Sequence, residues 1–364
     1  MISMKTFLRI INLSLILAVA SVSILSCQPK DKYISFSGHA QGGTYTVKVN
    51  LNGNKGMVKE SPKEIKSAVD SILASIDNSI SGYNKGSILS RFNSGIHVIP
   101  DNIFIDIYRH GYNLYEETEG IVDVASGPIF DLWGFGFKSG ELPDKTTVEA
   151  TRKSCGMGRL KKDIAETIGT DGTICGNDIL KSEHSTETTP VLNYNAIAQG
   201  YSCDLVADYL TSIGIKDMLV DIGEIFCSGL NPSGMPWTLA IDKPIDGNND
   251  LGAHIQGIFR APAGRHGIVT SGNYRKFRVS EGKKYAHSID PRTGRPVEHN
   301  LLSATIVAPD ALTADAYATY CMVVGLKESQ KLLTEREDLE GCLIYDDNGN
   351  FCTWCSEGFI LEEL

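Results

Sequence analysis

Apolar and polar residues recur with the period of a helix in three segments of the chain. In the first, residues 61–64 (Ser-Pro-Lys-Glu) have the form of a capping box with proline at the first helical position. Apolar residues then recur on one helical face, which predicts a helix over about residues 62–78. The same spacing predicts a second helix from Phe104 that ends near Gly120, and a third from Tyr201 that ends at Gly214.

Short β-rich runs lie between and after these helices. The predicted strands are residues 45–49, 218–222, 237–241, 267–270 and 303–308. Near the end of the chain two further apolar runs flank Asn348-Gly349, a pair typical of a type I′ hairpin turn. Because strands and helices do not alternate regularly, we predict an α+β fold with mixed, largely antiparallel sheets packed with helices.

The first residues have the layout of a secretory signal peptide. Lys5 and Arg9 precede an apolar run, 10–25, that is too short to span a bilayer and stops at Ser26-Cys27. Residues 24–27 (Ile-Leu-Ser-Cys) resemble a bacterial lipobox, in which the cysteine carries acyl chains. We therefore expect a signal peptide over 1–26, a lipidated Cys27, a linker over 27–36 and one domain over 37–364. The alternative is a plain cleaved signal with an incidental cysteine.

This arrangement predicts an extracytoplasmic protein that is anchored by lipid to a bacterial membrane, on the periplasmic side of the inner membrane. The chain has 44 acidic and 34 basic residues, a net charge of -10. Since no basic stripe is evident, nucleic acid is a poor candidate partner. A polyanionic ligand would need a metal ion or local donors.

Eight cysteines remain after Cys27, and their spacing fixes no pairing. Cys203, Cys227 and Cys321 lie in apolar contexts typical of buried thiols. Residues 352–355 (Cys-Thr-Trp-Cys) have the form of a redox or zinc pair, but no second pair or histidine lies close enough in sequence to complete a zinc site. We interpret this pair as structural.

Two stretches offer oxygen ligands for a hard cation. Asp315 and Thr319 are four residues apart on one face of an alanine-rich helix, which would point a carboxylate and a hydroxyl in the same direction. Asn193 to Tyr201 lead into the third predicted helix, where backbone groups are unpaired, so the Ala196 carbonyl could face a cation. The alternatives are a solvated helix edge or an i,i+4 hydrogen bond for the first stretch, and a simple asparagine N-cap for the second.

A histidine and several aromatic residues supply the remaining candidate chemistry. His287 lies in a turn-rich stretch with Asp290, and a histidine can move a proton near neutral pH. A tight turn capped by Asp290 is the structural alternative. Aromatic residues among glycines over 81–93 and 123–136 suit a flat ligand, or equally a packed loop core.

In this order, these segments resemble the ApbE family of FAD:protein FMN transferases. Seven blocks carry the resemblance: Gly43-Thr44-Tyr45, Tyr83 with 89–93, 127–136, 197–201, 270–275, 287–296, and Ala314-Asp315 with Thr319. The resemblance implies a Mg²⁺-dependent enzyme that splits FAD at its pyrophosphate, releases AMP and attaches FMN through a phosphodiester bond to a threonine or serine of an acceptor protein. Expected acceptors are flavoprotein subunits of membrane electron-transfer complexes.

The resemblance also implies roles for individual residues. The metal would be held by the Ala196 carbonyl, the Asp315 carboxylate and the Thr319 hydroxyl, and His287 would assist deprotonation of the acceptor hydroxyl. FAD contacts are implied for Tyr83, Ile121, Val122, Asp123, Asn193, Gln199 and Ile289. The alternatives are a Mg²⁺-dependent FAD diphosphatase that gives FMN and AMP, or a non-catalytic FAD-binding lipoprotein.

The chain departs from the family pattern at a few positions. Asn193 and Gln199 stand where many relatives have charged residues, and Gly42 stands where a methionine is usual. Residues 221–225 have one glycine, Gly223, where the family usually has two. This change would either shift a strand register or shorten a loop.

Overall fold

The computed structural model describes residues 32–53, 56–136, 142–184, 190–245, 252–274, 277–280 and 283–363. The predicted signal peptide and the lipidation position at Cys27 lie outside these ranges. Within them, no helix combines the length and the apolar character that crossing a membrane requires.

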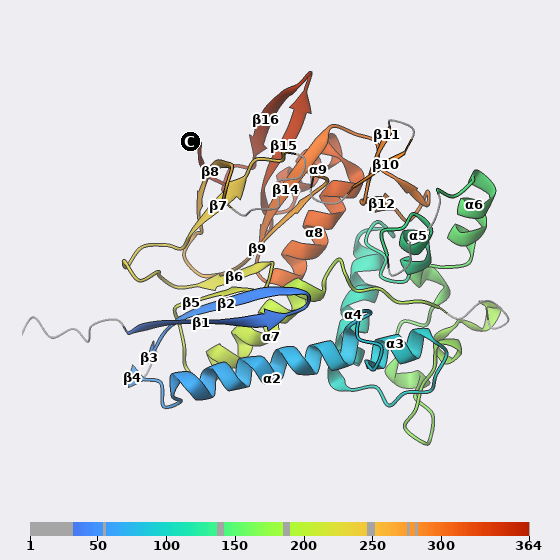
Figure 1. Ribbon diagram of the computed structural model, residues 1–364, viewed down its shortest axis with the longest axis horizontal. Coiled ribbons are helices and arrows are strands. Elements are labelled where there is room, and N and C mark those ends of the chain that lie inside the picture. Colours follow the sequence, from blue (N-terminus) through green and yellow to red (C-terminus); the bar gives the residue numbers. More distant parts are fainter. Residues whose placement is uncertain are drawn as a thin grey trace, which may run out of the picture.

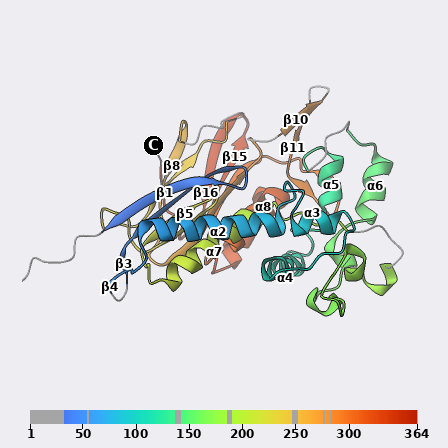
Figure 2. The same cartoon turned by 60° about the horizontal axis from the view of Figure 1, so that its bottom comes forward.

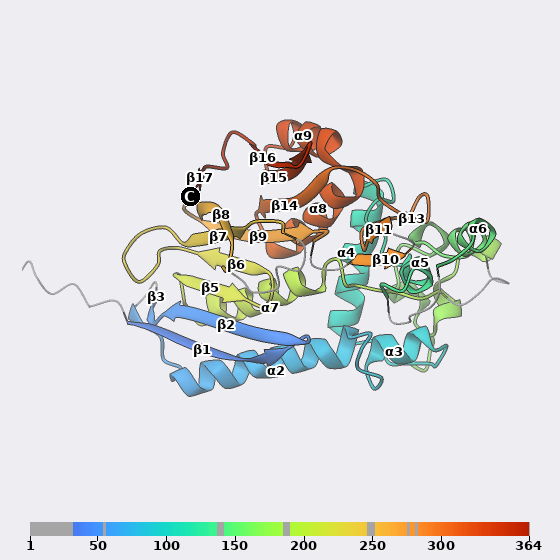
Figure 3. The ribbon, with the colours of Figure 1, turned by 45° about the horizontal axis from the view of Figure 1, so that its top comes forward.

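The fold is built on one eight-stranded sheet in which every neighbouring pair is antiparallel (Figure 3). This confirms the predicted α+β class with a largely antiparallel sheet. In spatial order its strands are β1 (Tyr33–Ala40), β2 (Gly43–Asn50), β5 (Met218–Asp221), β6 (Ile225–Ser228), β9 (Arg265–Gly272), β14 (Leu301–Ala308), β15 (Glu340–Asp347) and β16 (Asn350–Cys355).

Smaller sheets flank it. A three-stranded sheet consists of β17 (Leu361–Glu363), β8 (Ile255–Arg260) and β7 (Thr238–Asp242). The two-stranded pairs are β3 (Asn52–Gly53) with β4 (Gly56–Met57), β10 (Phe277–Ser280) with β11 (Lys283–Ala286), and β12 (Ile289–Asp290) with β13 (Arg295–Pro296).

Helices pack around these sheets (Figure 1). The α-helices are α2 (Pro62–Ile80), α3 (Ile88–Asn93), α4 (Asn102–Glu117), α5 (Gly127–Leu132), α6 (Lys145–Lys153), α7 (Ala198–Ser212), α8 (Ala311–Val324) and α9 (Leu326–Glu335). Short 3₁₀ helices are η1 (Met157–Arg159), η2 (Ala165–Thr167), η3 (Gly176–Ile179) and η4 (Ser182–His184).

Local sequence signals explain where α2 begins and which face it buries. The Glu64 amide donates to the Ser61 hydroxyl at 3.3 Å, and the Ser61 amide donates to the Glu64 carboxylate at 2.8 Å, so the predicted capping box is present. Ile65, Val69 and Leu73 are buried on one side, where each apolar side chain contributes roughly 1.5–3 kcal/mol. Figure 2 shows α2 lying beside α7 along the sheet.

The two faces of the large sheet have different partners. On one face α7 and α8 pack against each other, and α8 packs against β9 and β14. On the other face, Trp237, Phe259 and Phe359 form an apolar cluster with sheet residues. The α7–α8 contact is close, because a Cβ on Gly200 would lie 2.3 Å from the Ala311 carbonyl oxygen. Only glycine therefore allows the start of α7 to lie against α8.

The β5–β6 hairpin carries the single glycine, Gly223, in its turn. Its register runs without a shift from Met218 opposite Ser228 to Asp221 opposite Ile225, which leaves Ile222 to Glu224 as the turn. Gly223 has φ +94°, a left-handed angle that favours glycine. The turn is short and the strand register is regular.

Both cysteines of the C-x-x-C segment lie on β16, and the second one, Cys355, is paired with a cysteine on β15. Cys355 is directly opposite Cys342 on β15, whereas Cys352 is opposite Tyr345. The Ser356 amide donates to the Gly341 carbonyl at 2.9 Å, so the next pair, Cys342 and Cys355, is of the non-hydrogen-bonded kind with closely spaced Cα atoms. A hydrogen bond between these two thiols raises the pKa of Cys342, and burial adds to this effect.

Candidate active site

All eleven residues that the sequence analysis selected line one cavity of about 320 Å³. The cavity lies where α7, α8, the loop before α5 and the β11–β13 segment meet. The eleven are Tyr83, Ile121, Val122, Asp123, Asn193, Ala196, Gln199, His287, Ile289, Asp315 and Thr319.

The start of α7 and the middle of α8 present three oxygen groups to this cavity. The Gly200 amide donates to Asp315 Oδ2 at 3.1 Å. In a continuous helix this amide would pair with the Ala196 carbonyl. Among the described residues no hydrogen bond reaches that carbonyl. Thr319 lies one helical turn beyond Asp315 on α8 and lines the same cavity.

Burial makes Asp315 electrostatically unusual. Its side chain is buried, and this burial raises the pKa of its carboxyl well above the ordinary value, with the negative charge of Asp204 adding to the effect. Asp204 accepts hydrogen bonds from the Ala311 and Leu312 amides, both at 2.8 Å, but burial still raises its pKa to about 7. Two acids in a poorly solvated place favour a bound cation.

These groups match the ligand preference of a hard divalent cation. Mg²⁺ binds oxygen ligands, usually one or two carboxylates together with substrate phosphates. A carbonyl without a hydrogen-bond donor and a buried carboxylate could serve as two such ligands, and the Thr319 hydroxyl as a third. The residues present therefore fit a magnesium ion.

Gln199 is held by the turn that carries Gly223. Its Nε2 donates to the Ile222 carbonyl at 3.0 Å, and a Cβ on Gly223 would lie 2.4 Å from this nitrogen. Glu224, in the same turn, also lines the cavity. The glycine thus lets the β5–β6 turn approach the wall of the site.

Asn193 and Tyr83 are linked through Asn195. The Asn193 side chain accepts from the Asn195 amide at 3.0 Å, and Asn195 Nδ2 donates to the Tyr83 hydroxyl at 3.2 Å. The Asn193 amide donates to the Val124 carbonyl at 2.7 Å, so this segment lies beside the loop before α5. Tyr83 is 66% exposed and forms the outer rim.

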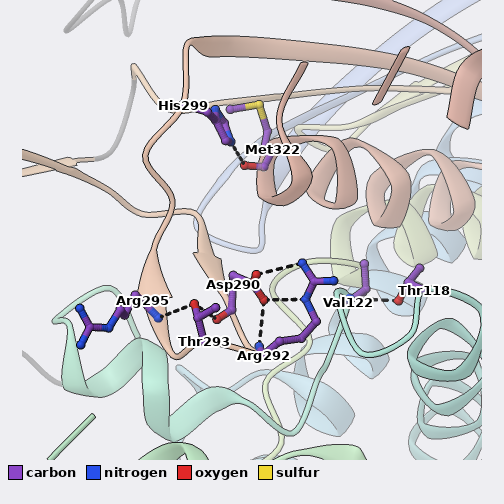
Figure 4. Close-up of polar contacts among 8 residues, drawn as sticks. All are labelled: Thr118, Val122, Asp290, Arg292, Thr293, Arg295, His299 and Met322. Atoms are coloured by element: carbon purple, nitrogen blue, oxygen red, sulfur yellow. Dashed lines mark hydrogen bonds and ion pairs between the residues drawn. The ribbon is translucent and has the colours of Figure 1, made fainter. Parts of the chain in front are cut away.

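The carboxylate of Asp123 is engaged by the protein backbone. It accepts from the Ala125 amide at 2.8 Å and from the Met157 amide at 3.1 and 3.2 Å. Burial nevertheless raises its pKa to about 6, because these hydrogen bonds offset only part of the desolvation. Its neighbours Ile121 and Val122 are buried, and the Val122 amide donates to the Thr118 hydroxyl at 3.0 Å (Figure 4). Asp123 thus shapes this wall of the cavity.

His287 enters the cavity from the segment between β11 and β12. Its ring centroid lies 6.4 Å from that of Phe135. The buried Trp133 indole donates to the Gly294 carbonyl at 2.8 Å, which joins the loop after α5 to the β12–β13 turn. Two blocks that are far apart in sequence therefore meet at this wall.

Asp290, the acid that lies near His287 in the sequence, pairs with Arg292. Asp290 accepts from the Arg292 amide at 2.9 Å and from Nε and Nη2 of the same residue at 3.0 Å, so both carboxylate oxygens are used (Figure 4). Asp290 thus stabilises the turn through Arg292. This agrees with the alternative interpretation of the segment as a tight turn capped by Asp290. His287 itself lies at the cavity.

Several lining residues were not selected from the sequence. Phe130, Phe135, Thr270 and Ser271 lie within blocks of the family resemblance, so the signal was present although no role was given to them. Ser288 also lies within such a block, and Asn195 lies in the segment that leads into α7. Glu224 and Met322 belong to none of the seven blocks, and only the packing of the β5–β6 turn and of α8 places them at the cavity.

Comparisons with known proteins agree with this fold. The model of the ApbE family matches residues 42–343. The FAD:protein FMN transferase of Haemophilus influenzae is 32% identical over 352 residues, 94% of this chain and 96% of the relative. That of Escherichia coli K12 is 32% identical over 302 residues, 81% of each.

Solved structures give the same result. The apo form of the Pseudomonas stutzeri flavinyl transferase ApbE matches with a TM-score of 0.72 and 28% identity, over 90% of this chain and 95% of that one. The Vibrio cholerae flavin transferase ApbE matches with a TM-score of 0.71 and 30% identity, over 91% and 100%. The chain is thus an enzyme of the flavin transferase class. It belongs to the ApbE family, as the sequence blocks indicated.

Proposed function

We propose that this enzyme cleaves FAD in a Mg²⁺-dependent reaction and transfers the FMN half to a threonine or serine hydroxyl of an acceptor flavoprotein, with release of AMP. The observation that carries the proposal is that the buried Asp315 carboxylate, which accepts from the Gly200 amide, and Ala196 line one cavity. The names of the relatives support the flavin chemistry.

The proposed metal ligands are the Ala196 carbonyl, the Asp315 carboxylate and the Thr319 hydroxyl. Bound there, Mg²⁺ would neutralise pyrophosphate charge, the main electrostatic demand of phosphoryl transfer. The protein has a net charge of -10, so binding of a polyanion needs such local compensation. The Gly200 amide keeps the Asp315 side chain oriented toward the site.

His287 is the proposed general base. The transfer forms a bond between the acceptor oxygen and the FMN phosphorus and breaks the phosphoanhydride bond to AMP. The hydroxyl proton must leave as its oxygen attacks, and an imidazole at the cavity wall can accept it. Phe135 beside the ring limits the directions from which a hydroxyl reaches it.

A second hollow gives a dinucleotide room beyond the first. It has a volume of about 430 Å³ and shares Tyr83, Asn195 and Gln199 with the cavity described above. Tyr194 lines it, and its buried hydroxyl has no hydrogen-bond partner among the described residues. A buried polar group of this kind is usually satisfied by a ligand or by water. We propose that FAD extends across both hollows.

One assay tests the proposed reaction. The enzyme is incubated with FAD, Mg²⁺ and a candidate acceptor subunit, and the products are examined by denaturing-gel fluorescence and by AMP and FMN analysis. Covalent flavin on the acceptor with one AMP per flavin is the expected result. Free FMN with AMP would identify a diphosphatase instead, and intact bound FAD a non-catalytic carrier.

Two histidine variants sharpen the test. His287→Ala should bind FAD as the wild type does but transfer FMN roughly 10²–10⁴-fold more slowly, as expected when a general base is lost. His254→Ala is the matched control, since that exposed histidine precedes β8, outside both hollows. Weaker FAD binding by His287→Ala with an unchanged single-turnover rate would contradict the general-base role.

We further propose that the enzyme works outside the cytoplasm, held to the membrane by lipid on Cys27, with subunits of membrane electron-transfer complexes as acceptors. The N-terminal sequence pattern and the family resemblance support this location and these partners. Fractionation of cells that express the full chain would test the location.

A further inference from the structure

A second group of metal-ligand side chains lies outside the cavity, where residues 94–98 meet residues 173–178. Val98 and Ile174 form an isolated antiparallel bridge, with both amide-to-carbonyl distances at 2.9 Å. In antiparallel pairing, the residue before Val98 lies opposite the residue after Ile174. The bridge therefore brings His97 and Cys175 together on one side of the paired segments.

Asp178 joins them through the short helix η3. Cys175 immediately precedes η3, and its amide donates to Asp178 Oδ2 at 2.7 Å. One ligand atom from each of His97, Cys175 and Asp178 lies within 4.8 Å of the others. Ligand atoms around a tetrahedral zinc ion are roughly 3.3–3.7 Å apart, given metal–ligand bonds of about 2.0–2.3 Å. Small side-chain rotations that bring the three ligand atoms to this spacing would close the site.

We propose that His97, Cys175 and Asp178 bind a zinc ion, with water as the fourth ligand. An imidazole nitrogen, a thiolate sulfur and a carboxylate oxygen form a ligand set that Zn²⁺ accepts, and three protein ligands with one open position are a common zinc arrangement. Mg²⁺ prefers oxygen ligands alone, so the thiolate selects against it. The ion in this place would thus differ from the ion proposed for the cavity.

The ion would brace a wall of the cavity from a distance. Four residues before His97, the Asn93 side chain exchanges two hydrogen bonds of 2.8 Å with the Leu192 backbone. Leu192 directly precedes Asn193, which lines the cavity. A metal that links His97 to Cys175 and Asp178 would restrict the segment that holds this wall, without touching the substrate.

Cobalt titration tests the proposal, because a thiolate bound to Co²⁺ gives a near-ultraviolet charge-transfer band. The reduced, metal-free protein should develop this band with one equivalent of Co²⁺ and lose it when Zn²⁺ is added. Cys175→Ser should abolish the band. His97→Ala, a change at an exposed residue, should weaken Co²⁺ binding at least roughly tenfold while the protein remains folded. Asp178→Asn should weaken it as well.

Two control variants separate this site from other metal-binding groups. Asp315→Asn should keep the band, since Asp315 belongs to the cavity. Cys355→Ser should also keep it, since this change removes one of the two neighbouring thiols on β15 and β16, Cys342 and Cys355, and leaves Cys175 intact. The absence of a thiolate band at one equivalent of Co²⁺, or its survival in Cys175→Ser, would overturn the proposal. Unchanged affinity in His97→Ala would do the same.

Discussion

Replacement of Asp315 by asparagine should separate the stability of this protein from its activity. Asparagine has nearly the same shape, and its carbonyl oxygen can still accept the Gly200 amide, which is 3.1 Å from the carboxylate in the native chain. The substitution removes the negative charge. We expect Asp315→Asn to lose FMN transfer and yet to be more stable than the wild type when no metal is added.

The pKa of Asp315 sets the size and the pH dependence of this gain. Burial raises it from 3.8 to about 8, so the folded chain retains a proton that the unfolded chain has lost. Stability of the wild type should then fall as the pH rises from about 4 to about 8, by up to ~1.4 kcal/mol per pH unit. The complete loss would be roughly 6 kcal/mol. We expect about half of this, on the order of 3 kcal/mol, because the carboxylate borders a cavity that water can enter.

Chemical denaturation in the presence of a chelator, at about pH 6 and about pH 8.5, measures the free energy of unfolding of both proteins. The difference in favour of Asp315→Asn should grow with pH. Mg²⁺ at about 100 times its Kd should stabilise the wild type by about 2.7 kcal/mol and the variant far less. Asp221→Asn is the control. Burial also raises the pKa of the Asp221 carboxyl, which lies outside the cavity, so this variant should keep its Mg²⁺ response. A stability difference independent of pH, or a full Mg²⁺ response in Asp315→Asn, would refute the reasoning.

Three other changes test separate features. Gly223→Ala should lower the free energy of unfolding by about 1–3 kcal/mol, because φ is +94° and the added methyl meets the Gln199 side chain; an unchanged denaturation midpoint would contradict this. Oxidised glutathione should link Cys342 to Cys355 by thiol–disulfide exchange, and peptide mapping that finds Cys355 linked elsewhere would argue against the strand register. Cys27→Ser should leave the membrane fraction, whereas a correctly cleaved variant that remains there would exclude the lipid anchor.

The features that could be predicted from the sequence are those set by neighbours along the chain. The start of α2 follows from Ser61 and Glu64, three residues apart, and its buried face follows from the helical period. The β15–β16 hairpin follows from Asn348 and Gly349, whose positive φ angles fit the predicted turn. In these cases the interacting groups are so close in sequence that the pattern itself contains the contact.

The resemblance to a family selected residues that do line one cavity, but their environments depend on the tertiary structure. Asp315 is an ordinary helix residue until Gly200, 115 positions earlier, allows α7 to pack against α8 and bury it. Asp123 was selected for FAD, and only the fold shows that its carboxylate is held by the Met157 amide. Similarly, the C-x-x-C spacing suggested Cys352 as the partner of Cys355, whereas the register places Cys342 opposite it.

The sequence, through its resemblance to a family, therefore selected the candidate residues for the chemistry and gave their order along the chain. Tertiary structure decided which of them share a poorly solvated space, and with which partners. The physical reason is that pKa shifts, free carbonyls and metal-ligand groups depend on burial and distance, and these come from packing between distant segments. His97 and Cys175 show this most clearly, since only a bridge between two remote segments brings them together.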